Sequence, residues 1–307
     1  MRSLVVKMSA LGDIIQAFSV LSHLKSLGPV DWVVEAKFAD LVCAHPLIDR
    51  VIPFDTKNPR TWDIKYLRKM RYDTVYDLQG NCKSGLFTLL ARGKKKVGFT
   101  LAHNAEWPNR LALSHGIPIY PGDPIRNQYR TIVGATHSEP VPLIAQEVQS
   151  FEKPTLMVCT GSNWKSKRLL QDEWISLLKP IKNYQFLFVW KSCEEKVLAE
   201  SLQQALGGLI QGGLSLPQWQ ALMRVCKGVI SVDSCALHLA TDGGVPAFGL
   251  FGPSSGAIYG SADAFIQGEC PLDEHFLKRC PHLRTCKAPC MRNLPSNRLN
   301  QWVDALT

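Results

Sequence analysis

The chain has 307 residues, of which 46% are hydrophobic and 20% charged, and this balance excludes a disordered protein. The length is enough for two domains of roughly 150 residues, each with its own core. Lys and Arg outnumber Asp and Glu by 35 to 26, and the net charge of +9 points to anionic partners such as nucleotide phosphates, nucleic acid or an acidic membrane surface.

The N-terminus has no targeting signal in its first apolar stretch. Residues 4–6 are apolar, but Lys7 interrupts them too early for a signal peptide. No apolar run reaches the roughly 18 residues that a membrane span needs. We therefore expect a cytoplasmic protein that touches a membrane at most from inside.

The first half alternates short apolar runs with amphipathic stretches. A tight turn over residues 9–13 follows the first run, and Asp13 stands where a helix N-cap belongs. Alternating strands and helices predict a doubly wound parallel sheet. The strands are expected at residues 3–8, 30–35, 51–54 and 72–77, and the helices at 14–27, 38–42 and 79–90.

Residues 94–130 are basic and rich in loop-forming residues, which predicts a surface insertion. Residues 138–154 contain two proline-bearing segments typical of a linker. We therefore expect an N-terminal domain over residues 1–150 and a C-terminal domain over 151–307, both Rossmann-like and facing a cleft.

The second half repeats the pattern of the first. A polar loop over residues 160–170 follows its first strand, and Asp233 ends a buried strand directly before a helix. The strands are expected at residues 155–159, 185–190, 228–232 and 245–251, and the helices at 172–178, 193–206, 216–225, 235–241 and 297–306.

Asp13 follows a strand and starts a helix, so its carboxylate is expected at the carboxyl edge of the sheet. One interpretation is a helix cap that contributes about 1 kcal/mol. The other is a general base that takes a proton from an acceptor hydroxyl. Spacing alone leaves both open.

The helix that begins after Asp233 and Ser234 offers unpaired N–H groups, and its dipole favours an anion such as a pyrophosphate. Upstream, the loop 161–168 is rich in hydroxyl, amide and cationic groups, and Lys167 could neutralise a departing diphosphate. A cap, a core histidine at His238 and a solvated basic loop are the alternatives. The chain has no Walker A or Gly-x-Gly-x-x-Gly motif, which argues against an ATPase or a dehydrogenase.

Four cysteines, Cys270, Cys280, Cys286 and Cys290, crowd near the C-terminus with spacings of nine, five and three residues. Metal sites usually use tighter pairs. A structural metal, disulfides and buried free thiols remain open for this group.

Taken in order, these motifs resemble glycosyltransferase family nine, the heptosyltransferases of the lipopolysaccharide inner core. The resemblance lies in the opening Lys7-x-Ser9-x-x-Gly12-Asp13 and in Lys167 with Trp174 seven residues later. It continues through three further motifs: Tyr72-Asp73-x-x-x-Asp77-x-Gln79-Gly80-x-x-Lys83-Ser84, Ser231-Val232-Asp233-Ser234-x-x-x-His238-Leu239 and Phe251-Gly252-Pro253-Ser254.

The resemblance implies a GT-B architecture and an inverting transfer of heptose from ADP-heptose to an anionic acceptor of the Kdo-lipid A type, without a metal or other cofactor. It also implies a transient contact with the inner leaflet. The chain has no helix-turn-helix, zinc-finger or aromatic RNP pattern, so we expect no nucleic-acid partner. Asp13 is implied as the general base and Lys167 as the diphosphate ligand. The implied donor-binding residues are Ser162, Asn163, Lys167, Glu194, Leu214, Asp233, Ser234, Cys235 and His238; the acceptor candidates are Lys57, Arg60, Arg126 and Arg130.

Two departures from the family pattern matter. Family members often carry Asp-Thr-Gly where this chain has Asp233-Ser234-Cys235, so a thiol stands where glycine lets a phosphate approach. The phosphate loop is also less rich in threonine. These departures keep two alternatives open: a non-catalytic protein that binds a nucleotide sugar or glycolipid on the same scaffold, and a transferase for another donor sugar or acceptor.

Overall fold

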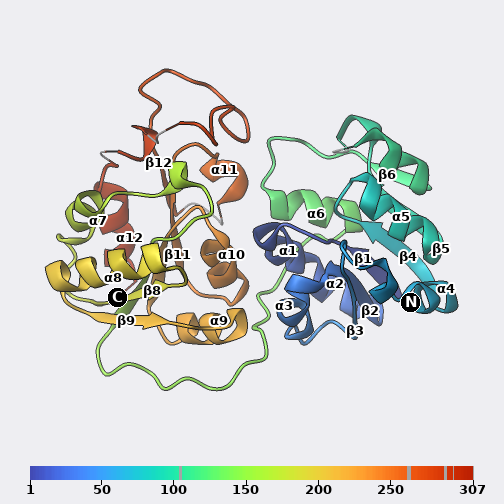
Figure 1. Cartoon of the computed structure of the whole chain (residues 1–307), viewed down its shortest axis with the longest axis horizontal. Helices are drawn as coiled ribbons and strands as arrows, with labels where there is room; N and C mark the ends of the chain where they lie inside the picture. The colour runs from blue at the N-terminus through green and yellow to red at the C-terminus, as the bar shows by residue number, and fades with distance from the viewer. Residues whose placement is uncertain (104–105, 261–263, 287–288, 293, 307) are drawn as a thin grey trace. The chain divides into compact units, whose positions relative to one another are not determined.

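Two parallel β-sheets of six strands each form the framework of the computed structural model, which describes residues 1–103, 106–260, 264–286, 289–292 and 294–306. The chain divides into two units, residues 1–144 and 145–307, and each unit contains one sheet with helices between its strands (Figure 1). This is the α/β, doubly wound class that the sequence predicts.

The sheet of the first unit has the order β3-β2-β1-β4-β5-β6, and every neighbouring pair is parallel. Parallel strands need crossover connections, and α-helices form most of them in this unit. The strands are β1 (Ser3–Val6), β2 (Val30–Glu35), β3 (Arg50–Phe54), β4 (Arg71–Asp77), β5 (Arg92–Phe99) and β6 (His115–Ile117). The helices are α1 (Leu11–Ala17), α2 (Leu21–Leu27), α3 (Ala39–Cys43), α4 (Ile64–Lys69), α5 (Cys82–Leu90) and α6 (Ile125–Val133).

The sheet of the second unit has the order β12-β11-β10-β7-β8-β9 and is also parallel throughout. Its strands are β7 (Thr155–Cys159), β8 (Gln185–Trp190), β9 (Leu209–Gly212), β10 (Gly228–Val232), β11 (Ala247–Phe251) and β12 (Phe265–Gln267). Its helices are α7 (Gln171–Leu178), α8 (Cys193–Leu206), α9 (Leu216–Arg224), α10 (Cys235–Asp242), α11 (Gly256–Tyr259) and α12 (Asn297–Asp304).

Each unit has a hydrophobic core of its own. In the first, Phe54 and Phe87 meet over the sheet with their ring centroids 4.7 Å apart. In the second, Trp174 and Phe188 are fully buried among the strands and helices. Burial of apolar surface at about 25 cal/mol per Å² is the main force that holds each sheet to its helices.

Three expectations from the sequence are wrong. Residues 94–130 are not a surface insertion, because they contain most of β5, all of β6 and part of α6. Asp13 is not a helix cap, because α1 starts at Leu11 with Ala10 at the N-cap position, which places Asp13 in the first turn. The predicted single helix over residues 14–27 is instead α1 and α2, joined by a 3-10 turn, η1 (Phe18–Val20).

Candidate functional site

The loop that carries Asp13 is fixed by a neighbouring strand end. The side-chain oxygen of Gln79 accepts hydrogen bonds from the backbone N–H groups of Met8 and Ser9, at 3.0 and 3.1 Å. Gln79 follows β4 at the same edge of the sheet as the end of β1. The Gln79 amide therefore sets the path of the turn into α1.

The carboxylate of Asp13 is half-exposed and, among the described residues, has no ion pair within 4 Å. Asp13 interacts electrostatically with Lys7, which is buried directly after β1 with its Nζ 5.1 Å from the centre of the Tyr129 ring. Burial lowers the pKa of Lys7, while Asp13 and Asp77 pull it in the opposite direction. The sequence motif includes Lys7, but sequence reasoning gave it no role.

Asp77 is structural. One of its oxygens accepts the backbone N–H groups of Gln79 and Gly80, and the other accepts Thr88 and Asn109. These four donors satisfy a fully buried carboxylate. Asp77 therefore fixes the turn between β4 and α5.

The acceptor candidates fall into two pairs. Arg126 and Arg130 lie one turn apart on α6, which packs against α1. Lys57 and Arg60 are exposed on the connection between β3 and α4. Arg130 donates to the side chain of Asn127 at 2.6 Å, so part of its guanidinium is engaged within α6.

In the second unit, Lys167, Asp233 and Ser254 converge from three loops at the carboxyl edge of the sheet. Lys167 Nζ lies 2.5 Å from Asp233 Oδ2, and the hydroxyl of Ser254 donates to the same oxygen. Lys167 and Asp233 are only 8% and 6% exposed. Sequence reasoning missed the role of Ser254, although it lies in a quoted motif.

Neighbouring side chains stabilise the negative charge of Asp233. Burial alone raises the pKa of the Asp233 carboxyl, but Lys167, the Ser254 hydroxyl and the nearby His238 outweigh it and hold that pKa below its usual value. His238 is buried on α10, one turn after its start. The site is therefore a buried, paired charge cluster rather than a solvated basic loop.

The loop 161–168 is tied to this cluster at two points. Ser162 donates its hydroxyl to the backbone carbonyl of Asp233 at 3.1 Å, and Arg168 donates to the carbonyl of Ser162 at 2.7 Å. Arg168 also pairs with Glu194 at 2.8 Å, so Glu194 is already engaged. Asn163 is exposed on the same loop.

The start of α10 has the geometry of an anion site. Ser234 is the N-cap, and its hydroxyl accepts the N–H of Ala236. Cys235 is the first helical residue, and burial raises the pKa of its thiol to about 11, so the thiol carries no charge. A neutral helix start with free N–H groups favours an anionic ligand.

Leu214 and Gly252 complete this edge. Leu214 is half-buried in the loop after β9. Because the sheet is parallel, this loop lies at the same edge as the loops after β7, β8 and β10. The backbone of Gly252 lies close to the C-terminal segment. A Cβ there would lie 2.5 Å from Met291 Sδ and 3.1 Å from Cys290 Sγ, so the close neighbour is the C-terminal segment.

The four C-terminal cysteines are free thiols. Burial raises the pKa of Cys290 to about 11, and the thiols of Cys286, Cys270 and Cys280 act on it in the same direction. Within the described part of the chain, no three His, Cys, Asp or Glu side chains are arranged to hold a metal ion.

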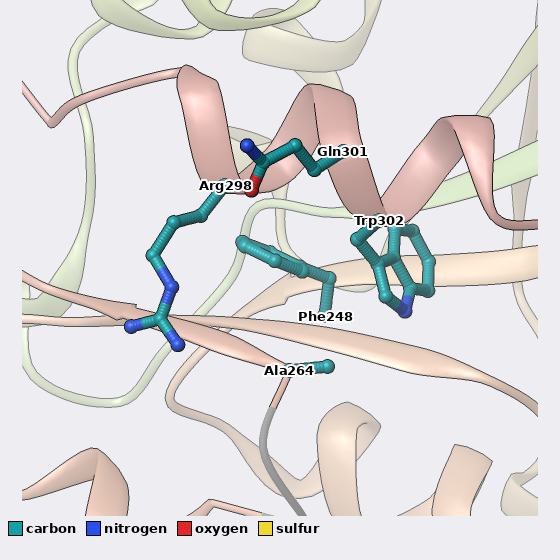
Figure 2. A pocket seen from close by; sticks show the side chains of 5 residues that line it. All are labelled: Phe248, Ala264, Arg298, Gln301 and Trp302. Atoms are coloured by element: carbon teal, nitrogen blue, oxygen red, sulfur yellow. The ribbon is translucent and has the colours of Figure 1, made fainter.

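A cavity of about 390 Å³ lies away from these residues (Figure 2). Arg298, Gln301 and Trp302 reach it from α12, and Phe248 and Ala264 line it from the sheet side. None of the predicted site residues lines this cavity, and it gathers a single charged group. The residues predicted from the sequence to bind a donor therefore lie elsewhere, at the carboxyl edge of the sheet.

Residues 127–264 match the family described as glycosyltransferase family 9 (heptosyltransferase). Lipopolysaccharide heptosyltransferase 1 of Pseudomonas aeruginosa is 26% identical over 93% of this chain and 89% of its own length. The Escherichia coli K12 enzyme of the same name is 36% identical over 35% of this chain and 36% of its own.

Solved structures show the same fold. Escherichia coli heptosyltransferase WaaC with ADP superposes with a TM-score of 0.77 at 20% identity, covering all of both chains. Escherichia coli ADP-heptose lps heptosyltransferase II gives 0.71 at 19% identity, covering 100% of this chain and 98% of its own.

The fold and these matches define a glycosyltransferase with a GT-B architecture. The resemblance to glycosyltransferase family 9, predicted from the sequence motifs, is confirmed. No helix in the described residues is both long and apolar enough to cross a bilayer.

Proposed function

We propose that this glycosyltransferase transfers heptose from ADP-heptose, with inversion, to an anionic lipopolysaccharide inner-core acceptor of the Kdo-lipid A type. The first unit binds the acceptor and the second binds the nucleotide sugar, in the cytoplasm at the face of the inner membrane. The observation that carries the proposal is the buried Lys167–Asp233–Ser254 cluster beside the start of α10. The curated relatives named lipopolysaccharide heptosyltransferase and the ADP-bound structure support it.

The donor residues act on the leaving group. Glycosyl transfer breaks the bond between the anomeric carbon and the diphosphate oxygen, so negative charge develops on ADP. Lys167 has three N–H donors and can hold Asp233 and a phosphate oxygen together. Backbone N–H groups at the start of α10 stabilise the same charge. Ser162, Asn163 and His238 contact the diphosphate and sugar, Glu194 the ribose and Leu214 the adenine.

Asp13 acts on the acceptor. Its carboxylate takes the proton as the acceptor hydroxyl oxygen forms the new bond to the anomeric carbon. A carboxylate without an ion pair is suited to this role because no neighbouring cation has to be displaced. The cations Lys57, Arg60, Arg126 and Arg130 hold the acidic groups of the acceptor.

The test is turnover of ADP-heptose with Kdo2-lipid A, followed by mass spectrometry of the product. Asp13→Asn should lower the rate by about 10²- to 10⁴-fold, because the amide cannot accept the proton. Asp40→Asn is the matched control, since Asp40 is also in the first turn of a helix in this unit but is fully exposed. Equal rates for Asp13→Asn and wild type would refute the role of Asp13.

A second candidate is a non-catalytic binding protein on the same scaffold, favoured by Cys235 at the first position of α10. ADP-heptose binding without product, across lipid and oligosaccharide acceptors, would establish it. Product formed only from another nucleotide sugar would identify a different donor.

A further inference from the structure

Four large apolar side chains are exposed on two adjoining elements of the first unit. Leu86 and Leu89 on α5 are 43% and 56% exposed, and Trp107 and Leu111 on η5 (Trp107–Ala112) are 67% and 75% exposed. Single exposed apolar residues are common on soluble proteins, but a group of this size on adjoining elements marks an interaction surface.

Helix α5 and η5 pack side by side and turn these residues outward. Asn109 donates to Asn81 and Ser84, and a Cβ at Gly85 would meet Asn109 and Ala112 within 3.6 Å. Residues 84, 85, 87 and 88 of α5 are therefore buried, whereas 83, 86 and 89 recur on its solvent side. The outward sides of both elements carry leucine or tryptophan where polar residues normally lie.

A cationic hollow adjoins the end of α5. It has a volume of about 600 Å³, and Arg71, Arg92, Lys94 and Lys96 contribute its positive charges. The Nζ of Lys96 donates to the carbonyl of Leu89 at 3.0 Å, which joins the hollow to the apolar residues. Burial lowers the pKa of Lys96, so an anion that enters the hollow would favour its charged form.

Acidic groups are few on this side. Asp73 lies in the hollow and pairs with Lys94 at 2.7 Å. Glu106 is engaged with the backbone N–H of Cys82, and Glu35 pairs with Lys37 and approaches Lys83 at 3.8 Å. The local excess of charge is positive.

We infer that the outward side of α5 and η5, with the adjoining hollow, is a docking surface for the headgroups and upper acyl chains of an anionic phospholipid bilayer. Leucine and tryptophan beside Lys and Arg are the combination that binds such an interface, because the apolar groups enter it and the cations meet the lipid phosphates. A second protein chain fits less well, since four cations around one hollow call for an anionic partner. This inference deepens the membrane contact included in the proposed function, and it assigns that contact to residues other than Asp13 and Lys167.

The test is co-sedimentation with vesicles of phosphatidylglycerol and phosphatidylethanolamine in equal parts, beside vesicles of phosphatidylcholine alone. The protein should bind the first and not the second, and binding should weaken as salt rises. Arg92→Gln with Lys94→Gln should reduce partitioning by about fivefold for each charge removed. Lys95→Gln is the matched control: Lys95 is exposed between Lys94 and Lys96 but does not line the hollow.

The apolar part is tested with Leu89→Asn and Trp107→Ser, against Leu277→Asn, which is 61% exposed in the other unit. The first two should each reduce vesicle binding by about tenfold, and the third should leave it unchanged. Analytical ultracentrifugation and thermal unfolding accompany every variant, because a loss of folding would otherwise imitate a loss of binding.

Three results would overturn the inference: no binding to anionic vesicles, a loss in Lys95→Gln as large as the loss per charge in the double variant of Arg92 and Lys94, or a change of oligomeric state in Leu89→Asn with vesicle binding intact. The last would make this side a contact between protein chains. Vesicle binding needs no turnover, so absence of heptose transfer would refute the proposed function and leave this result standing.

Discussion

The ion pair between Lys167 and Asp233 is almost inaccessible to water, and this sets what each side chain can do. A buried charge without its partner costs several kcal/mol, whereas a paired one is close to neutral for stability. The pair therefore keeps a cation at the proposed diphosphate site without the desolvation cost of a lone buried lysine. We expect Lys167 and Asp233 to be coupled in their effects on stability.

Lys167→Met should lower turnover by about 10²- to 10³-fold, because the variant lacks the positive charge that stabilises the leaving diphosphate. It should also destabilise the protein by about 3–5 kcal/mol, since Asp233 is left buried and unpaired. Adding Asp233→Asn should restore most of the stability but not the turnover. Urea unfolding and initial rates check both parts, with the exposed Lys165→Met as control. Recovery of turnover in the double variant would contradict this account.

His45 makes stability depend on pH. It is 2% exposed, packs on Phe18 with centroids 4.7 Å apart, and accepts the N–H of Leu47 at Nδ1. Burial lowers the pKa of His45 from 6.5 to about 4. Above 6.5 the ring is neutral in both states and its contribution is complete. Below 6.5 the unfolded chain takes up the proton first, and the contribution is lost as pH falls toward 4.

This loss amounts to about 3 kcal/mol between pH 6.5 and 4. His45→Asn keeps an acceptor for Leu47 but does not titrate, so it should be less stable than wild type at pH 7 and approach it at pH 4. Urea unfolding across this range measures the gap, and the exposed His137→Asn should follow the wild-type curve. A constant gap would mean that folding does not lower the pKa of His45.

At the scale of elements, the start of α10 combines a serine cap with Cys235. Substitution by glycine removes a Cβ from the side where the proposed diphosphate would meet backbone N–H groups, at a cost of up to about 1 kcal/mol in helix stability. Cys235→Gly should therefore lower the KM for ADP-heptose severalfold and leave kcat largely unchanged. Steady-state kinetics test this. An unchanged KM would show that the thiol does not crowd the donor.

The elements that could be predicted are those whose apolar runs are buried on both faces. Residues 228–232 are an example, because five buried residues in a row leave no doubt about a central strand. β5 was missed because it begins with Arg92, Lys94 and Lys95, which are exposed, and only Val97 onward is buried. These charged residues do not show the apolar pattern of a buried strand, and β5 forms by pairing with β4 and β6.

The candidate site was predictable as a set of loops but not as contacts. Lys167 and Asp233 are 66 residues apart, and only the pairing of β7 with β10 brings their loops together. The ion pair of Arg168 with Glu194 and the hydrogen bond of Ser254 to Asp233 also join residues that follow different strands. Spacing along the chain carries no information on such pairs.

At the scale of the whole molecule, two cores without shared strands imply two folding units. Calorimetry should resolve two transitions, and ADP should move only the one that belongs to residues 145–307. At 100 times its Kd, ADP stabilises that unit by about 2.7 kcal/mol. Lys167→Met should reduce the shift, and the other transition serves as the internal control. A single transition that moves as a whole would mean that the units unfold together.

The order of strands has a further consequence for how such enzymes diversify. Counted within its own unit, each sheet runs 3-2-1-4-5-6, and no strand of one sheet belongs to the other. A genetic crossover in the segment between α6 and β7 would therefore exchange a complete half and cut no strand pair. If the proposed division of roles holds, new acceptors could be acquired by recombination of whole halves, with the second half inherited intact, rather than by gradual change of one site.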